Sequence, residues 1–344
     1  MTAPNPAATA FPTLADVLDA QRVIRGAADN TPLVPSPHLS SRAGREVLLK
    51  LENMQPVGAF KLRGAVNAVS RLPGDCPGVV CCSTGNHGRG VAFAARARGL
   101  RAVICMSDLV PEAKRAGIRA LGAEVRIHGT SQDDAQDEAT RLVAAGGLAE
   151  ISPFDDPHVI AGQGTIGIEM LAARPDLATL LIPLSGGGLA AGIALAAKTI
   201  NPAIRTIGIT MDRGAAMHAS IRAGRPVPVT EVASLADSLG GGIGPDNRLT
   251  LPMCRDLLDE TILVTEEEIR DAMQVLFFED RIVAEGGSVV GIAALLSGRL
   301  DLPAGPLATV ITGRNCDMAK FAAIMAGEDL RMGDMILKGR HYGA

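Results

Sequence analysis

Strand-length apolar runs alternate with helix-length segments from residue 78 onward, and this alternation leaves few folds open to the chain. Strands are predicted at residues 78–82, 101–106, 123–128 and 148–152, and helices at residues 90–98, 111–121 and 131–145. Strands separated by helices form β-α-β units, in which the strands run parallel and the crossovers are right-handed. The pattern therefore predicts an α/β protein with open, mostly parallel sheets flanked by helices.

The alternation of predicted strands and helices continues through the second half of the chain. Strands are predicted at residues 178–184, 204–210, 261–264 and 307–312, and helices at residues 159–173, 189–200, 213–223, 266–281, 287–297 and from 317. A stretch rich in proline and glycine, residues 226–252, interrupts the pattern as a loop. Pro153 and Pro157 interrupt it earlier, so we expect a boundary between two lobes near residues 152–158.

Composition excludes nucleic acid as an expected partner. The 344 residues are 47% hydrophobic, which is enough for a large core, and the net charge of −4 comes without any basic block. Aromatic residues make up only 2% of the chain, so platforms for stacking single-stranded bases are missing.

A membrane location is not expected either. The N-terminus lacks a signal-peptide pattern and the six cysteines form no CxxC pair, so we expect free thiols in a reducing cytoplasm. Residues 178–197 carry no charge and have the length of a membrane span. Pro183 and the glycines at 186–188 break this stretch, which predicts a buried strand, a loop and a buried helix.

A glycine-rich loop at residues 185–189 (Ser-Gly-Gly-Gly-Leu) follows a predicted strand and opens a predicted helix. Glycines let backbone N–H groups approach an anion, and a helix N-terminus favours negative charge. Gly186, Gly188 and Gly192, with Asp212 at the end of the next strand, also resemble a dinucleotide-binding fingerprint. A phosphate site, a nicotinamide site and a plain tight turn all remain open from this loop alone.

A second polar loop, residues 83–88 (Ser-Thr-Gly-Asn-His-Gly), also follows a predicted strand. Its hydroxyl, amide and backbone N–H groups suit a carboxylate or a phenolate oxygen, although an ordinary helix cap explains them equally well. His87 by itself indicates a structural histidine.

Lys61 lies where a tight loop meets a helix, in the run 58–64 (Gly-Ala-Phe-Lys-Leu-Arg-Gly). Most lysines are solvated surface charges. Apolar neighbours on both sides place this one in a cleft, where loss of hydration destabilises the ammonium ion and makes the amine a nucleophile.

Taken together, these segments resemble the pyridoxal-phosphate enzymes of the tryptophan-synthase-β fold (fold-type II), in the threonine/serine dehydratase and serine racemase branch. The resemblance extends from about residue 16 to residue 326. Its motifs are residues 58–64, 83–88, 159–165 (VIAGQGT), the glycine-rich loop and 312–315 (TGRN). Residues 235–244 and 277–285 are most similar to the hydroxyectoine-utilisation dehydratase subgroup.

The resemblance implies a large cofactor-binding domain of residues 1–57 and 158–344, a small mobile domain of residues 58–157, and a homodimer. It implies that Lys61 carries pyridoxal 5′-phosphate and then acts as base or acid at the substrate Cα. Further cofactor contacts are implied for Phe60, Asn86, Ser185, Gly186, Gly187, Gly188, Leu189, Glu285 and Thr312. Substrate contacts are implied for Ser83, Thr84, Gly85, His87 and Arg314.

Departures from the family pattern narrow the expected chemistry. Thr84 stands where racemases have a serine that acts on the face opposite the lysine, and its methyl group favours elimination over racemisation. Thr210 and Ala216 occupy positions where related racemases have acidic metal ligands, so no metal is expected, although Asp212 lies close in sequence. Arg314 replaces a glycine, and either binds a second substrate carboxylate or pairs with a nearby acid (Glu285 or Asp317).

The expected activity is dehydration and deamination of a β-hydroxy amino acid to a 2-oxo acid and ammonia. A hydroxyl group at residue 312 leaves the pyridine nitrogen largely unprotonated, and this favours expulsion of a β-hydroxyl group. β-Hydroxyaspartate or a related compound from hydroxyectoine breakdown is the expected substrate.

Three other functions stay open. They are a racemase or β-replacement enzyme of the same fold, an NAD(P)-dependent oxidoreductase, and a non-catalytic binding protein. An oxidoreductase gives no role to Lys61 or to the loop at 83–88, and a binding protein would tolerate the loss of Lys61, which is present.

Overall fold

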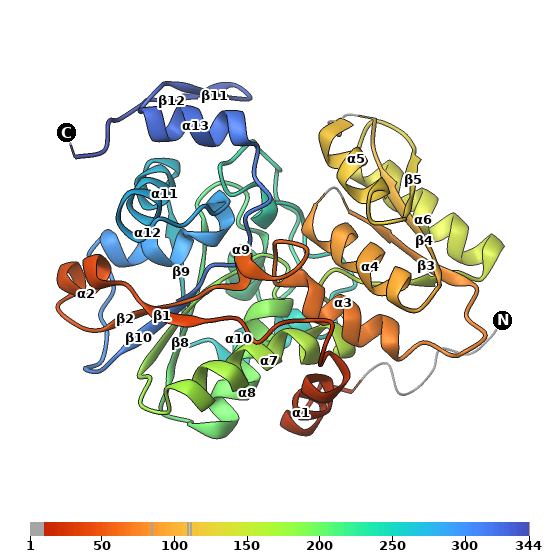
Figure 1. The fold of residues 1–344 in the computed structure, drawn as a ribbon, viewed down its shortest axis with the longest axis horizontal. Helices are drawn as coiled ribbons and strands as arrows, with labels where there is room; N and C mark the ends of the chain where they lie inside the picture. Colours follow the sequence, from red (N-terminus) through yellow and green to blue (C-terminus); the bar gives the residue numbers. More distant parts are fainter. Residues whose placement is uncertain (1–9, 84, 109, 111, 344) are drawn as a thin grey trace.

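Two separate β-sheets organise the molecule (Figure 1). The computed structural model describes residues 10–83, 85–108, 110 and 112–343. The larger sheet has six strands in the order β1 (Leu33–Pro35), β2 (Val47–Lys50), β10 (Leu307–Val310), β7 (Thr179–Pro183), β8 (Arg205–Met211) and β9 (Glu260–Val264). Every pairing is parallel except β1 with β2. The predicted α/β class with open, mostly parallel sheets is confirmed.

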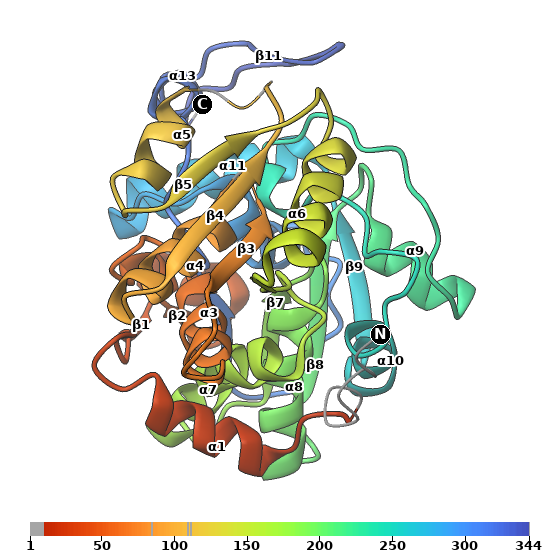
Figure 2. The ribbon, with the colours of Figure 1, turned by 90° about the vertical axis from the view of Figure 1, so that its right-hand side faces the viewer.

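The smaller sheet is entirely parallel and is built from a central segment of the chain. Its four strands lie in the order β5 (Glu124–Ile127), β4 (Arg101–Met106), β3 (Gly78–Cys82) and β6 (Ala149–Glu150). Figure 2 shows α4 (Asn86–Ala97) and α6 (Gln132–Gly146) on opposite faces of this sheet. α5 (Glu112–Arg119) follows β4 and packs beside β5.

Alternating side chains divide the larger sheet between two apolar layers. On β7, Leu181 joins the layer formed with α2 (Pro37–Ala43), α11 (Glu266–Asp280), α12 (Val290–Leu296) and α13 (Met318–Ala326). The neighbouring Leu180 and Ile182 join the opposite layer, with α7 (Pro157–Ala173), α8 (Gly188–Ile200), α9 (Ala216–Ala223) and α10 (Thr250–Leu257). A strand buried on both faces reads as a continuous apolar run, which is why the sequence pattern at 178–184 was strong.

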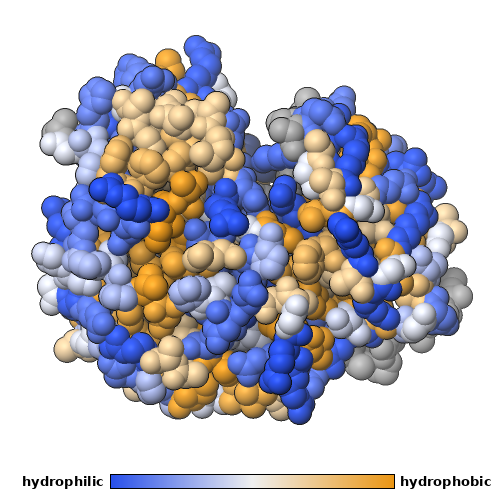
Figure 3. Space-filling model, in the orientation of Figure 1, coloured by the Kyte–Doolittle hydropathy of each residue, from blue (hydrophilic) through white to orange (hydrophobic). Residues whose placement is uncertain are grey.

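α3 (Lys61–Ser70) connects the two sheets, because it packs against α4 on one side and α7 on the other. A Cβ atom on Gly162 would lie 2.7 Å from the Arg63 carbonyl oxygen and 2.7 Å from the Gly64 Cα. Glycines at 64 and 162 therefore let the backbones of α3 and α7 approach closely. Figure 3 shows a notch between the part that carries α13 and the part that carries α5.

Several predicted boundaries were wrong. α4 begins at Asn86 instead of residue 90, since packing against α3 outweighs the low helix propensity of Asn86, Gly88 and Gly90. α9 begins three residues later than predicted, and a 3₁₀ turn, η4 (Gly286–Ser288), precedes α12.

Some elements were not predicted. They are α1 (Leu14–Val23), β1, α2, β2, the 3₁₀ turns η2 (Glu52–Met54) and η3 (Asp237–Leu239), α10, and the hairpin of β11 (Leu330–Met332) and β12 (Met335–Leu337). α10 falls within the stretch taken for a loop. Its Pro252 occupies the first helical turn, where a missing N–H costs no helical hydrogen bond.

The apolar stretch 178–197 is confirmed as strand, loop and helix, namely β7, the glycine-rich loop and α8. Within the described residues, no helix combines the length and the apolar character that a membrane crossing needs.

Replacing Gly162 by alanine tests the close approach of α3 and α7. The added Cβ meets backbone atoms, which cannot rotate away, so we expect a loss of about 1–3 kcal/mol in the free energy of unfolding. Chemical denaturation measures it. Gly146→Ala is the control, because the nearest atom to its new Cβ is 3.9 Å away. Equal stability of the two variants would contradict the packing argument.

Candidate functional site

Backbone pairing brings Lys61 next to the loop that follows β10, which is more than two hundred residues away in the sequence. Phe60 N–H donates to the Thr312 carbonyl (2.9 Å), and Arg314 N–H donates to the Gly58 carbonyl (2.9 Å). Gly58 adopts a φ of 77°, and a Cβ there would lie 2.8 Å from Asn315 Oδ1. The turn before α3 thus requires glycine and fixes the direction from which Lys61 enters the site.

The Lys61 amine is partly buried and makes one hydrogen bond with the residues that the structure describes. Its Nζ donates to the carbonyl oxygen of Pro153 at 2.5 Å and lies 5.5 Å from the centre of the Phe60 ring. Burial lowers the pKa of Lys61 to about 8. A substantial fraction of the amine is therefore neutral, and nucleophilic, near physiological pH.

A buried ionic cluster surrounds Arg63, two residues after this lysine on α3. The Arg63 guanidinium, which is fully buried, donates twice to Glu52 (2.8 Å each) and twice to Glu169 (2.6 and 2.8 Å). Lys50 Nζ donates to Glu169 at 2.5 Å. The two positive and two negative side chains thus have no net charge. They come from β2, η2, α3 and α7, and their contacts connect these four elements.

The glycine-rich loop leaves its backbone N–H groups available. Among the described residues, no acceptor is recorded for the N–H groups of Gly186, Gly187 and Gly188. A Cβ on Gly186 would lie 2.1 Å from the Phe154 ring, and Gly187 adopts a φ of 91°. Only glycine fits these positions, and three unpaired donors at the N-terminus of α8 form a site for an anion.

Asn86, Asn315 and Glu285 form a hydrogen-bonded chain at the carboxyl end of β3. Asn86 Nδ2 donates to Glu285 Oε1 (2.8 Å), and Asn315 Nδ2 donates to Asn86 Oδ1 (2.7 Å). Both partners fix the orientation of the Asn86 amide, which keeps one N–H for a ligand. Burial raises the pKa of Glu285 to about 7, and the Asp237 carboxylate acts in the same direction.

Thr312 presents a hydroxyl group that is held by a second hydroxyl. Its Oγ1 lies 2.8 Å from Ser288 Oγ, and both side chains are buried. Ser288 Oγ also accepts from Gly313 N–H (2.7 Å) and lies 2.8 Å from the Gly313 carbonyl oxygen. Thr312 is therefore oriented by an uncharged partner.

The loop at 83–88 is largely a helix start. Ser83 Oγ accepts from Gly88 N–H at 3.0 Å, and His87 Nε2 contacts the Ile151 carbonyl at 2.8 Å. Burial lowers the pKa of His87 to about 3, so this ring is neutral and does not exchange protons at physiological pH. At Gly85 the space that a side chain would take is open. Thr84 lies outside the described residues.

Arg314 is exposed, and its guanidinium makes no ion pair with any residue that the structure describes. Of the two alternatives for Arg314, the pairing with Glu285 or Asp317 is therefore not observed among the described residues. The loop backbone, by contrast, is held through Gly58.

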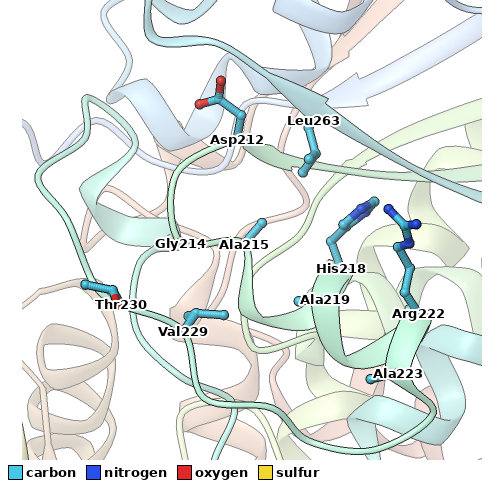
Figure 4. A pocket seen from close by; sticks show the side chains of 10 residues that line it. All are labelled: Asp212, Gly214, Ala215, His218, Ala219, Arg222, Ala223, Val229, Thr230 and Leu263. Atoms are coloured by element: carbon cyan, nitrogen blue, oxygen red, sulfur yellow. The ribbon is translucent and has the colours of Figure 1, made fainter.

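A cavity of about 740 Å³ lies beyond the carboxyl end of β8 (Figure 4). Asp212, His218, Arg222 and Thr230 line it, whereas the glycine-rich loop does not. In this cavity Asp212 therefore lies without the glycine-rich loop that a dinucleotide would need. In the residues that the structure covers, no group of three or more His, Cys, Asp or Glu side chains is arranged for a metal ion.

Some site residues were not identified from the sequence. Asn315 orients Asn86, Ser288 orients Thr312, and Phe154 covers the glycine-rich loop. Asn315 lies within the motif at 312–315, which was a usable signal. Ser288 and Phe154 act through contacts between segments distant in sequence, and local patterns carry no sign of these.

The lowered pKa of Lys61 is testable by its reaction with an amine-acylating reagent in the protein without ligand. We expect acylation of Lys61, followed by mass spectrometry, to rise with pH around a midpoint near 8, because only the neutral amine reacts. In the urea-unfolded protein the midpoint should move toward the ordinary lysine value of about 10.4. Identical midpoints in the two states would refute the effect of burial.

Comparison with known proteins identifies the family. The model of the family described as "Pyridoxal-phosphate dependent enzyme" matches residues 24–313. A protein of Sinorhizobium fredii that is named as a threonine dehydratase is 56% identical over 86% of this chain and 90% of its own. The L-threonine ammonia-lyase of Thermotoga maritima is 40% identical over 89% of this chain and 76% of its own.

The solved structure of maize serine racemase has the same fold, with a TM-score of 0.87, 30% identity, and coverage of 92% of this chain and 98% of that one. Family model, relatives and fold all indicate the same family. The chain belongs to the family of pyridoxal-phosphate dependent enzymes.

Proposed function

We propose that the protein is a dehydratase that converts a β-hydroxy amino acid to a 2-oxo acid and ammonia. The observation that carries this proposal is the partly buried Lys61 amine, whose pKa is lowered to about 8, between an anion-binding loop and an uncharged hydroxyl pair. Relatives named threonine dehydratase and L-threonine ammonia-lyase support it.

The residues present fit pyridoxal phosphate. The N–H groups at 186–188, for which no acceptor is recorded among the described residues, suit its phosphate. We assign the Asn86 amide to the phenolic oxygen, the Thr312 hydroxyl to the ring nitrogen, and the Phe60 side chain to the ring. Ser185 and Leu189 complete the phosphate loop, and Lys61 provides the amine that carries the aldehyde carbon.

Bound pyridoxal phosphate supplies an electron-withdrawing ring that acidifies the substrate Cα–H bond. In the proposed reaction the Lys61 amine removes the Cα proton, and the Cβ–O bond then breaks. The leaving hydroxyl takes up a proton and departs as water. The enamine that is released takes up water and yields the 2-oxo acid and ammonia, so no oxidant is needed.

The loop at 83–88 is assigned to the substrate carboxylate. Ser83, Gly85 and His87 shape this loop at the N-terminus of α4, which favours an anion. Thr84, the second catalytic candidate, belongs to the same loop. Glu285, with a pKa of about 7, is assigned to holding Asn86 in place at the cofactor.

We further propose that the substrate has a second carboxylate, as in β-hydroxyaspartate from hydroxyectoine breakdown. Arg314 supports this because it lies two residues after Thr312, is exposed, and forms no ion pair with any described acid. A guanidinium binds a carboxylate through two parallel hydrogen bonds. We also propose a cytoplasmic homodimer, in which residues 58–157 move as a small domain.

The decisive experiment is the visible spectrum of the purified protein during titration with L-threonine, L-serine and the β-hydroxyaspartate isomers, with oxo acid and ammonia measured in parallel. We expect equal release of oxo acid and ammonia, and loss of both in Lys61→Ala. Lys320→Ala, an exposed lysine on α13, is the control. Inversion of the substrate without ammonia release would identify a racemase instead.

Arg314→Ala should impair only the dicarboxylate substrate. We expect kcat/KM for β-hydroxyaspartate to fall about 10- to 100-fold, as for a lost charged hydrogen bond of about 1.5–3 kcal/mol, while threonine turnover stays within about twofold. Arg331→Ala, an exposed arginine on β11, is the control. An equal decrease for both substrates would contradict the role of Arg314 in substrate selection.

A further inference from the structure

In the hydrogen bond between Ser288 and Thr312, either hydroxyl group can be the donor, and the proposed reaction has not assigned this direction. Ser288 Oγ has one proton and two lone pairs. One lone pair accepts from Gly313 N–H at 2.7 Å. The proton has two acceptors within reach, the Gly313 carbonyl and Thr312 Oγ1, each at 2.8 Å.

The hydroxyl protons of Ser288 and Thr312 can be arranged in two ways. The first satisfies both hydroxyls within the protein, and the second does so only when a ligand accepts from Thr312. In the first, Ser288 donates to the Gly313 carbonyl and Thr312 donates to Ser288. In the second, Ser288 donates to Thr312, and the Thr312 proton points into the site. The second arrangement needs an acceptor there, and the Gly313 carbonyl keeps its bond from Glu285 N–H (3.1 Å) in both.

We propose that Ser288 is a positioning residue that turns Thr312 into a hydrogen-bond donor toward the ring nitrogen of pyridoxal phosphate. When the ring nitrogen offers a lone pair, the pair adopts the second arrangement and every proton remains bonded. Ser288 thereby supports the unprotonated form of the nitrogen, which favours elimination over reactions that need a long-lived carbanion.

This inference rests on the proposed assignment of Thr312 to the ring nitrogen. No ionisable side chain contacts either hydroxyl among the described residues. The orientation therefore depends on hydrogen-bond geometry alone. Hydroxyl groups in such a chain polarise one another, so the bond that Ser288 donates also strengthens the donor property of Thr312.

NMR of bound pyridoxal phosphate that carries an isotope label at the ring nitrogen tests the proposal without substrate. Thr312→Val removes the donor and defines the resonance of a ring nitrogen with no partner. We expect Ser288→Ala to move the resonance from the wild-type position toward that of Thr312→Val. The cofactor dissociation constant should rise up to about tenfold, as for one lost hydrogen bond.

The double variant Ser288→Ala, Thr312→Val distinguishes an effect that acts through Thr312 from a general disturbance of the site. Ser288→Ala should have no further effect on the resonance in the Thr312→Val background, since both changes remove one interaction. Ser220→Ala is the matched control, because it removes another fully buried serine that accepts a backbone N–H, from Val227 (3.1 Å). It should leave the resonance unchanged.

Three outcomes would overturn the proposal. They are a wild-type resonance in Ser288→Ala, equal shifts in both backgrounds, and coincidence of the wild-type and Thr312→Val resonances. If Ser288→Ala does not fold, Ser288→Cys replaces it, because a thiol keeps the shape and donates weakly; an unshifted resonance there also refutes the proposal. A failure of the dehydratase proposal appears instead as absence of oxo acid, with the resonance result intact.

Discussion

The buried cluster of Arg63, Glu52, Glu169 and Lys50 holds the site together. Taking four charges out of water costs several kcal/mol per ion, so the cluster adds little to stability by itself. Removing one member, however, leaves an unpaired buried charge and costs about 3–5 kcal/mol. The Arg63 side chain can meet both carboxylates in only one position of α3. The cluster thus fixes the helix that carries Lys61, two residues before Arg63.

Two backbone hydrogen bonds then fix the position of α3 relative to the rest of the site. The turn before α3 pairs with the loop after β10 through Phe60 and Arg314, so Lys61 and Thr312 keep a fixed relation. Pro153 accepts from the Lys61 amine, and Asp155 in the same segment accepts from three N–H groups at residues 248–250. A single short segment thereby joins the lysine, the glycine-rich loop and α10.

The sequence predicted what depends on local pattern. β3 and β4 were placed at their observed residues, since both are short, apolar and flanked by helices. The lysine and the glycine-rich loop were found because each needs special residues at fixed positions. Ser288 and Phe154 were missed, because their roles arise only when distant segments meet. The two-lobed division and the role of each site residue remain proposals.

Charge distribution explains why this site suits elimination. Around the expected ring His87 is uncharged, Ser288 and Thr312 are hydroxyls, and Glu285, with a pKa of about 7, is only partly ionised near physiological pH. A carboxylate at Thr312 would stabilise a positive ring nitrogen and a persistent carbanion. A neutral pair gives the carbanion no such support, so departure of the β-hydroxyl group competes well with reprotonation. In the proposed function, the exposed Arg314 is the charge that would distinguish a dicarboxylate substrate from threonine.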